Sequence, residues 1–140
     1  MSHSRILVLE GNRFYINCDD IFDTMQSYGN GVDYVTESES KYENDLDWFI
    51  KYAEDLGITQ IEKGFKIDSI CTFWTEMHED VLRLLEDGLP TCHWQLVERL
   101  RMVHGFWIYY QDSLWTLPHF MEQVKDGDTF TVKKFLDYHF

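Results

Sequence analysis

The stretch from Asp68 to Gly88 constrains the fold more than any other part of the sequence, because its apolar residues recur with the period of an α-helix. Asp68 or Ser69 can cap the start of this helix, and Gly88 can supply the left-handed residue that ends it. The apolar stripe consists of Ile70, Phe73, Trp74, Met77, Val81, Leu84 and Leu85, with Cys71, His78 and Leu82 on its flank. Together they cover roughly half of the helix circumference, so we expect the helix to pack against several neighbours.

Two shorter helices are predicted before this stretch. Asp19 or Asp20 can cap the first, and a Gly-Asn-Gly break at residues 29–31 ends it. The second opens at the capping-box pattern of residues 40–43 and ends at Gly57. Its apolar stripe is Tyr42, Leu46, Phe49, Ala53 and Leu56, with Trp48 and Tyr52 beside it. This stripe defines the face that we expect to be buried.

A further helix is predicted from Cys92 to His104. Because only residues 89–91 link it to the preceding helix, the two should pack antiparallel. Pro118 cannot continue a central strand, and residues 119–124 can form one or two helical turns after it.

Three segments have the pattern of a β-hairpin. Residues 5–17 have two apolar arms joined by a Gly-Asn pair that suits a type II′ turn. Residues 58–67 show a less regular strand pattern with a Glu-Lys-Gly turn. Residues 106–117 have apolar and aromatic arms that flank a three-residue Gln-Asp-Ser loop.

The C-terminal region adds one more predicted strand, residues 129–132, followed by a segment, 133–140, that fits either strand or helix. No internal repeat or linker interrupts the chain. The expected fold is α+β, with about four helices packed on a small antiparallel sheet built from the N-terminal and C-terminal hairpins. Residues 1–140 are expected to form a single globular domain.

The formal net charge of −13 is concentrated in one part of the chain. Between Asp19 and Asp55, seven Asp and four Glu stand against two Lys, so this part has a charge of −9 and the rest has −4. Such a field repels nucleic acid phosphates and attracts basic proteins or divalent cations. The sequence therefore predicts a basic protein partner and no direct binding of nucleic acid. Acidity that serves solubility alone is the alternative.

The leading hypothesis is a small acidic interaction module that binds and inhibits a basic partner, such as a nucleic-acid-processing enzyme. It would mimic nucleic acid charge, as immunity and counter-defence proteins do. Aromatic residues make up 16% of the chain, more than a small core easily hides, so some should lie at the surface as anchors. No enzymatic activity and no cofactor is predicted. The predicted partner-binding residues are Asp19, Asp20, Asp23, Glu43, Asp45, Asp47, Trp48 and Tyr52, with Tyr34 and Tyr42 as further candidate anchors.

Two alternatives remain open. One is a calcium- or transition-metal-binding regulatory protein that uses the acidic clusters or a site around His78. The other is a small enzyme with an interhelical site, in which His93 or His104 meets His78 or Cys71. No phosphate loop, serine elbow, CxxC pair or HExxH motif supports an enzyme, and residues 126–128 lack the later ligands of an EF-hand.

The three cysteines, Cys18, Cys71 and Cys92, show no paired spacing, and the first residues lack the apolar core of a signal peptide. No run approaches the roughly 18 apolar residues that a membrane span needs. The sequence therefore predicts a cytoplasmic protein that does not associate with membranes.

Overall fold

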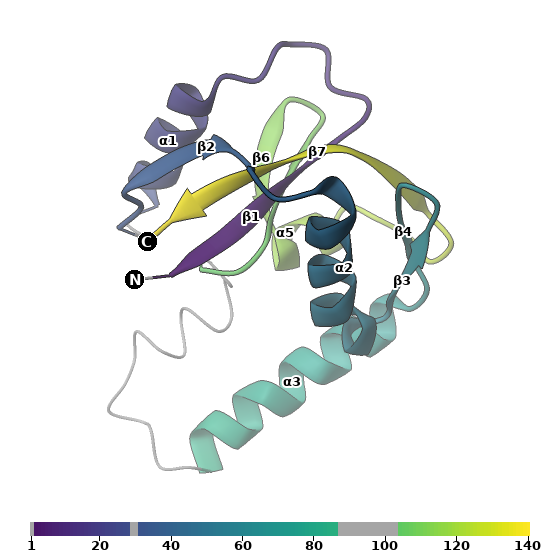
Figure 1. Cartoon of the computed structure of the whole chain (residues 1–140). Coiled ribbons are helices and arrows are strands. Elements are labelled where there is room, and N and C mark those ends of the chain that lie inside the picture. The colour runs from purple at the N-terminus through teal and green to yellow at the C-terminus, as the bar shows by residue number, and fades with distance from the viewer. Residues whose placement is uncertain (1, 29–30, 87–103) are drawn as a thin grey trace.

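The computed structural model describes residues 2–28, 31–86 and 104–140 (Figure 1). In these ranges the chain forms four α-helices and one sheet of seven strands, with helices on both faces of the sheet. The α+β prediction is confirmed. The sheet, however, is larger than the predicted hairpin sheet and is mixed rather than antiparallel.

Strand β7 (Thr129–His139) is the longest strand described and lies at the centre of the sheet. One edge of β7 pairs antiparallel with β1 (His3–Leu9). Its other edge pairs with β2 (Tyr34–Glu37) near the carboxyl end of β7 and with β4 (Gly64–Ile67) near its amino end. The C-terminal segment, which fitted strand or helix equally, is therefore a strand.

The remaining strands extend the sheet on both sides. Strand β3 (Ile58–Ile61) pairs with β4, and β5 (Trp107–Tyr110) pairs with β6 (Ser113–Thr116), so the order is β3-β4-β7-β1-β5-β6 with β2 beside β7. Strands β1 and β5 run parallel, and the other described pairs are antiparallel. The carboxyl ends of β1 and β5 therefore lie next to each other.

Strand β1 contributes to two cores, because successive side chains of a strand point to opposite faces. Ile6 and Val8 belong to the core on one face, and Leu7 and Leu9 belong to the core on the other. Each of the four is at most 1% exposed. Helix α1 (Cys18–Ser27) covers the first face through Ile21 and Met25. A strand buried on both faces needs the continuous apolar run that the sequence has here.

Besides the strands, four of the described helical elements contribute to the core on the second face. They are α2 (Tyr42–Ala53), the 3-10 helix η1 (Glu54–Leu56), α3 (Ile70–Glu86) and α5 (Leu117–Met121). Helix α5 begins at Leu117, two residues before the predicted helical turns, because Pro118 is compatible with the first turn of a helix.

Helix α2 confirms the predicted apolar stripe, since Leu46, Phe49 and Ala53 are all buried. The predicted capping box is not formed. Lys41 occupies the N-cap position and makes no side-chain cap hydrogen bond. The hydroxyl of Ser40 instead accepts a hydrogen bond from an Arg5 guanidinium nitrogen.

Helix α3 is less enclosed than its apolar pattern suggested. Phe73 and Met77 are buried, but Trp74 and Leu82 are 38% and 40% exposed. In the described part of the chain its main contact is with η1, and Figure 1 shows its carboxyl end extending beyond the sheet. His78, expected at the edge of the buried arc, is exposed.

The predicted N-terminal hairpin is wrong. After β1 the chain turns at Gly11, whose φ of +100° suits glycine, but residues 10–17 form no strand. The reason lies in the edges of β1, which β5 and β7 already occupy. Phe14 and Tyr15, predicted as part of the second arm, are instead 70% and 88% exposed.

The other two predicted hairpins are confirmed. Strands β3 and β4 meet at a turn in which Lys63 has a φ of +56°. Strands β5 and β6 are joined by two residues, Gln111 and Asp112, rather than three, and both have positive φ. The helix predicted from Cys92 to His104 falls outside the described residues except for its last residue.

Candidate functional site

The residues predicted to bind a partner lie mainly on two helices that cover opposite faces of the sheet. Six of the eight are exposed: Asp19, Asp20 and Asp23 on α1, and Glu43, Asp47 and Trp48 on α2. Tyr52 is half-buried against Phe106, with 5.0 Å between the ring centroids. The structure therefore does not bring the eight residues together on one face.

Exposed carboxylates on and around β2 connect the two helices. Every Asp and Glu of residues 19–55 except Asp45 is exposed, and we call this set the acidic surface. Its members lie on α1, on and around β2, on α2 and on η1, and Figure 1 shows how the chain connects these elements. Two members are paired: Asp33 Oδ2 lies 2.8 Å from His139 Nδ1, and Glu37 Oε1 accepts a hydrogen bond from Lys134 Nζ at 2.8 Å. The other acids of this set remain open to solvent.

Asp45 is the exception, because its side chain is only 2% exposed. Its Oδ1 accepts a hydrogen bond from Arg5 Nε at 2.9 Å, and its Oδ2 accepts one from Ser38 Oγ at 2.6 Å. The Arg5 guanidinium also donates to Asp137 Oδ1 at 2.8 Å and lies 5.1 Å from the Trp48 ring centroid. Asp45 therefore holds α2 to β1 from within the fold.

The two further candidate anchors have different environments. Tyr34 is 41% exposed and stacks on His139 with 5.2 Å between ring centroids. Tyr42 is half-buried, and its hydroxyl donates a hydrogen bond to Val132 O at 2.5 Å. Tyr34 thus presents a ring at the acidic surface, whereas Tyr42 ties α2 to β7.

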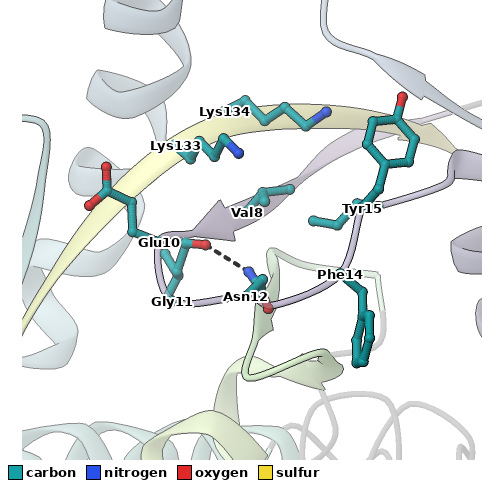
Figure 2. Close-up of a pocket in the computed structure, with 10 residues that line it drawn as sticks. Val8, Glu10, Gly11, Asn12, Phe14, Tyr15, Lys133 and Lys134 are labelled. Atoms are coloured by element: carbon teal, nitrogen blue, oxygen red, sulfur yellow. Dashed lines mark hydrogen bonds between the residues drawn. The ribbon is translucent and has the colours of Figure 1, made fainter.

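A second candidate site lies at the carboxyl end of β1, on the side of the sheet covered by α1 (Figure 2). It is a cavity of about 320 Å³, which we call the β1 cleft. It is lined by Val8, Leu9, Glu10, Gly11, Asn12, Phe14, Tyr15, Ile16, Lys133 and Lys134. The cleft combines two lysines with a loop that carries two highly exposed aromatic residues, of which Tyr15 points toward the lysines and Phe14 points away in Figure 2.

The loop that forms the cleft is held by hydrogen bonds between Asn12 and Asp112. Asn12 Nδ2 donates to Leu9 O at 2.7 Å (Figure 2), and its Oδ1 accepts from Asp112 N at 2.8 Å. Asp112 Oδ1 accepts from the backbone N–H groups of Arg13 and Phe14 at 2.9 and 3.1 Å. We call this arrangement the Asn12–Asp112 clasp. It links the loops that follow the parallel strands β1 and β5.

A β-bulge places both lysines at the cleft. In the β1–β7 ladder Val8 pairs with Lys134 and Leu9 pairs with Val132, which leaves Lys133 as an extra residue on β7. In a regular strand Lys133 and Lys134 would point to opposite faces. The bulge removes this alternation, so both line the cavity, and Figure 2 shows them extending on the same side.

The two lysines differ in their partners. Lys134 pairs with Glu37, and its Nζ lies 5.9 Å from the Tyr15 ring centroid. Lys133 is exposed and forms no ion pair with any residue in the described ranges. Glu10 also lines the cleft, and Figure 2 shows its carboxylate on the opposite side from Tyr15. Near Tyr15 the charge of Lys134 is thus balanced by Glu37, and Lys133 supplies the unpaired positive charge of the cleft within the described ranges.

A second cavity, of about 280 Å³, lies on the other side of the same loop. It shares Tyr15 and Ile16 with the β1 cleft. Burial, and then the carboxylates of Asp112 and Asp20, raise the pKa of the Tyr109 phenol in its wall. The raised pKa means that the phenolate form of Tyr109 is further disfavoured.

Of the described residues named in the alternative hypotheses, Cys71 and His78 lie on α3, whereas His104 stacks on Phe140 with 4.4 Å between ring centroids. Burial, and then the Glu37 carboxylate, raise the pKa of the Cys18 thiol, so its nucleophilic thiolate is disfavoured. Cys71 and His78 are exposed on α3. Within the described ranges no three His, Cys, Asp or Glu side chains are grouped so as to hold a metal ion. Cys92 and His93 lie outside these ranges.

The acids of the 126–128 segment have structural partners. Asp126 Oδ1 accepts a hydrogen bond from Ile70 N at 2.8 Å, at the start of α3. Asp128 Oδ2 accepts one from Lys125 N at 2.9 Å. Both carboxylates therefore stabilise backbone turns.

Sequence reasoning did not single out the residues of the β1 cleft. Phe14 and Tyr15 were assigned to a hairpin arm, although they follow a Gly-Asn pair that is typical of loops. Lys133 and Lys134 are adjacent lysines inside a segment of otherwise apolar and aromatic character. In a regular strand these two lysines would point to opposite faces, and only the pairing with β1 shows the bulge that brings them together.

No protein-family model, curated protein or solved structure matches this chain. In the part of the chain that the structure describes, no helix is long and apolar enough to cross a membrane. Function is therefore inferred from the acidic surface and the β1 cleft.

Proposed function

We propose that this chain is an interaction module that binds a basic protein through the acidic surface. The observation that supports the proposal is that exposed acids and exposed aromatic rings occur in the same part of the chain. Tyr28, Tyr34 and Trp48 are 41–42% exposed and lie among the exposed carboxylates of residues 19–55. Carboxylates pair with Arg and Lys, and aromatic rings supply the anchors that bury area at an interface.

The class of partner follows from the distribution of charge. The acidic surface has members on α1, around β2 and on α2, so a partner with a concave basic groove could contact carboxylates on both sides of the sheet edge. Enzymes that process nucleic acid have such grooves, and a protein that fills one excludes the phosphate backbone. The proposed module is therefore an inhibitor that acts as a nucleic acid mimic.

Stepped-salt capture from a cell lysate, followed by mass spectrometry and association kinetics on the captured protein, tests this proposal. Two charge-reversal pairs separate the sides of the sheet: Asp19→Lys with Asp23→Lys on α1, and Glu43→Lys with Asp47→Lys on α2. We expect a basic partner, an association rate that falls steeply with salt, and a slower rate for at least one pair.

The matched control is Glu62→Lys with Glu122→Lys, two exposed acids outside the acidic surface. This pair changes the net charge equally, so it reveals effects of overall charge. Binding that is insensitive to salt, or equal slowing by the control pair and both test pairs, would refute the proposal. Thermal melting of each variant shows that it remains folded.

A further inference from the structure

We propose that the β1 cleft binds a small aromatic anion, meaning a flat ring that bears one phosphate or carboxylate group. The cleft adjoins the acidic surface, because its Lys134 pairs with Glu37, but the ligand is assigned to other residues and this inference does not depend on the protein interface. Its volume of about 320 Å³ lies near the lower end of the range of about 300–1,000 Å³ that is typical of small-molecule sites.

The anionic group is assigned to Lys133 and Lys134. The bulge directs two adjacent side chains to one cavity, and Lys133 is exposed without an ion pair in the described ranges. Lys134 is held by Glu37 beside the Tyr15 ring, so its ammonium group has a defined position. Two ammonium groups provide charge-assisted hydrogen bonds to a phosphate or carboxylate.

The size of the anion is limited by the rest of the molecule. A net charge of −13 repels a long polyanion, which would extend from the cleft toward the acidic surface beside it. A small anion in the cleft meets the carboxylates of Glu10 and Glu37, whereas a long strand would also meet the other members of the acidic surface. A single charged group is therefore favoured over a nucleic acid strand.

The ring is assigned to the aromatic side of the cleft. Phe14 and Tyr15 are the two most exposed large apolar side chains described, at 70% and 88%. Their loop is ordered by the Asn12–Asp112 clasp, so the rings are presented before a ligand arrives. Val8 and Ile16 also line the cavity, but they are only 1% and 9% exposed, so the stacking surface is the aromatic side chain. Figure 2 shows the Tyr15 ring on the lysine side of the loop and the Phe14 ring pointing away, so Tyr15 fits the stacking role.

The experiment is a set of NMR titrations of the full chain with four probes that separate ring from charge. AMP combines a ring with a phosphate, and benzoate combines a ring with a carboxylate. Adenosine has a ring without the charge, and inorganic phosphate has the charge without a ring. We expect AMP or benzoate to shift the amide signals of residues 8–16 and 133–134, at least tenfold more tightly than adenosine or phosphate. The preference between AMP and benzoate identifies the anionic group.

Two pairs of variants test the assigned residues. Lys133→Gln with Lys134→Gln should weaken binding of the preferred probe at least tenfold, as expected for lost charge-assisted hydrogen bonds. Lys51→Gln with Lys125→Gln removes the same charge at exposed positions away from the cleft and should leave affinity within about twofold. Tyr15→Ala tests the ring and should also weaken binding.

Three results would overturn this proposal. The first is that neither AMP nor benzoate saturates the shifts up to its solubility limit. The second is that phosphate alone binds as tightly as both ring-bearing anions. The third is that the two lysine pairs weaken binding equally. Because the charge-reversal pairs of the acidic surface are different residues, the protein interface can fail while this proposal stands, and the reverse.

Discussion

Asp45 differs from the exposed acids around it, because it forms an ion pair with Arg5 inside the fold. The Arg5 and Asp45 side chains are only 12% and 2% exposed, so both charges have lost most of their contact with water. Removing one partner of a buried pair leaves the other charge uncompensated, which usually costs more than the pair contributes.

We therefore predict that Arg5→Met or Asp45→Asn lowers the free energy of unfolding by about 3 kcal/mol or more. The double variant should lose less than the sum, because the buried charge of Asp45 is removed together with Arg5 and only the partly exposed Asp137 loses its arginine partner. Chemical denaturation measures these values. Lys66→Met is the control: the Lys66–Asp68 pair spans 3.9 Å with both side chains over 40% exposed, and should be worth less than about 1 kcal/mol. A similar loss in both single variants and the control would contradict the prediction.

The raised pKa of the Cys18 thiol should make the stability of the fold depend on pH. Its thiol pKa is raised above 9.0 in the fold, mainly by burial, so the folded state retains the proton more strongly than the unfolded state does. The resulting stability is present below the unfolded pKa and is lost as pH rises through the folded value. We expect Tm to fall less between about pH 8 and 10 in Cys18→Ser than in the wild type.

Cys71→Ser is the matched control for this measurement, because Cys71 is exposed on α3. Thermal melting in reducing buffer should show the unchanged alkaline decline in that variant. An equal decline in Cys18→Ser and the wild type would remove Cys18 as its source.

At the scale of elements, the bulge in β7 predicts an unusual tolerance to deletion. Val132 and Lys134 pair with the consecutive residues Leu9 and Val8, so removing Lys133 should leave a regular ladder with both cores intact. We expect its deletion to change the free energy of unfolding by about 1 kcal/mol or less, measured by chemical denaturation.

Deletion of Thr131 is the control for the bulge. It moves Phe130 to the opposite face of the strand, away from Phe65 and Phe120, whose rings it contacts. The expected loss is about 3 kcal/mol or more, as for removal of a packed aromatic ring. Similar losses for the two deletions would mean that the bulge does not absorb the extra residue.

Local elements could be predicted from the sequence, and distant pairings could not. The β3–β4 and β5–β6 hairpins have turns and arms that adjoin in sequence. Strand β1 instead pairs with β5 and β7, whose residues lie about a hundred or more positions away. Nothing in residues 5–17 indicates these partners, so the sequence favours a hairpin between the first strand and the adjacent apolar segment. The same distance hid the β1 cleft, which combines residues 8–16 with Lys133 and Lys134.

The sequence predicts which helix acids should be exposed, but it does not predict which acid has a buried partner. The exposure of Asp19, Asp23 and Asp47 follows from their places on the polar faces of amphipathic helices. Asp45 is an aspartate on α2, as Asp47 is, but it is buried because Arg5 on β1 lies opposite it. Charge counting cannot reveal a partner that is forty residues away.

At the scale of the whole molecule, the two ends of the described chain meet in the sheet. Ser2 N donates to Phe140 O and Phe140 N donates to Ser2 O, each at 2.9 Å. A short linker between these residues would turn the β7–β1 pairing into a hairpin.

We predict that a circular permutant with this linker folds, when new ends are opened between Asp126 and Gly127 in an exposed turn. It should refold faster than the wild type, because the most distant strand pairing becomes a local one. Stopped-flow refolding measures the rate. The control is the chain nicked at the same turn without the new linker, which shows the effect of the new ends alone. Refolding of the permutant at the wild-type rate or more slowly would contradict the prediction.

The central place of β7 also sets the order of events on the ribosome. This strand is synthesised about 120 residues after β1, which takes roughly 6 to 24 s at about 5–20 residues per second. Throughout that time the nascent chain has an apolar strand, residues 6–9, whose β7 edge has no partner. Chaperones that recognise short apolar segments would meet this protein through its first strand, long before either of its candidate functional surfaces exists.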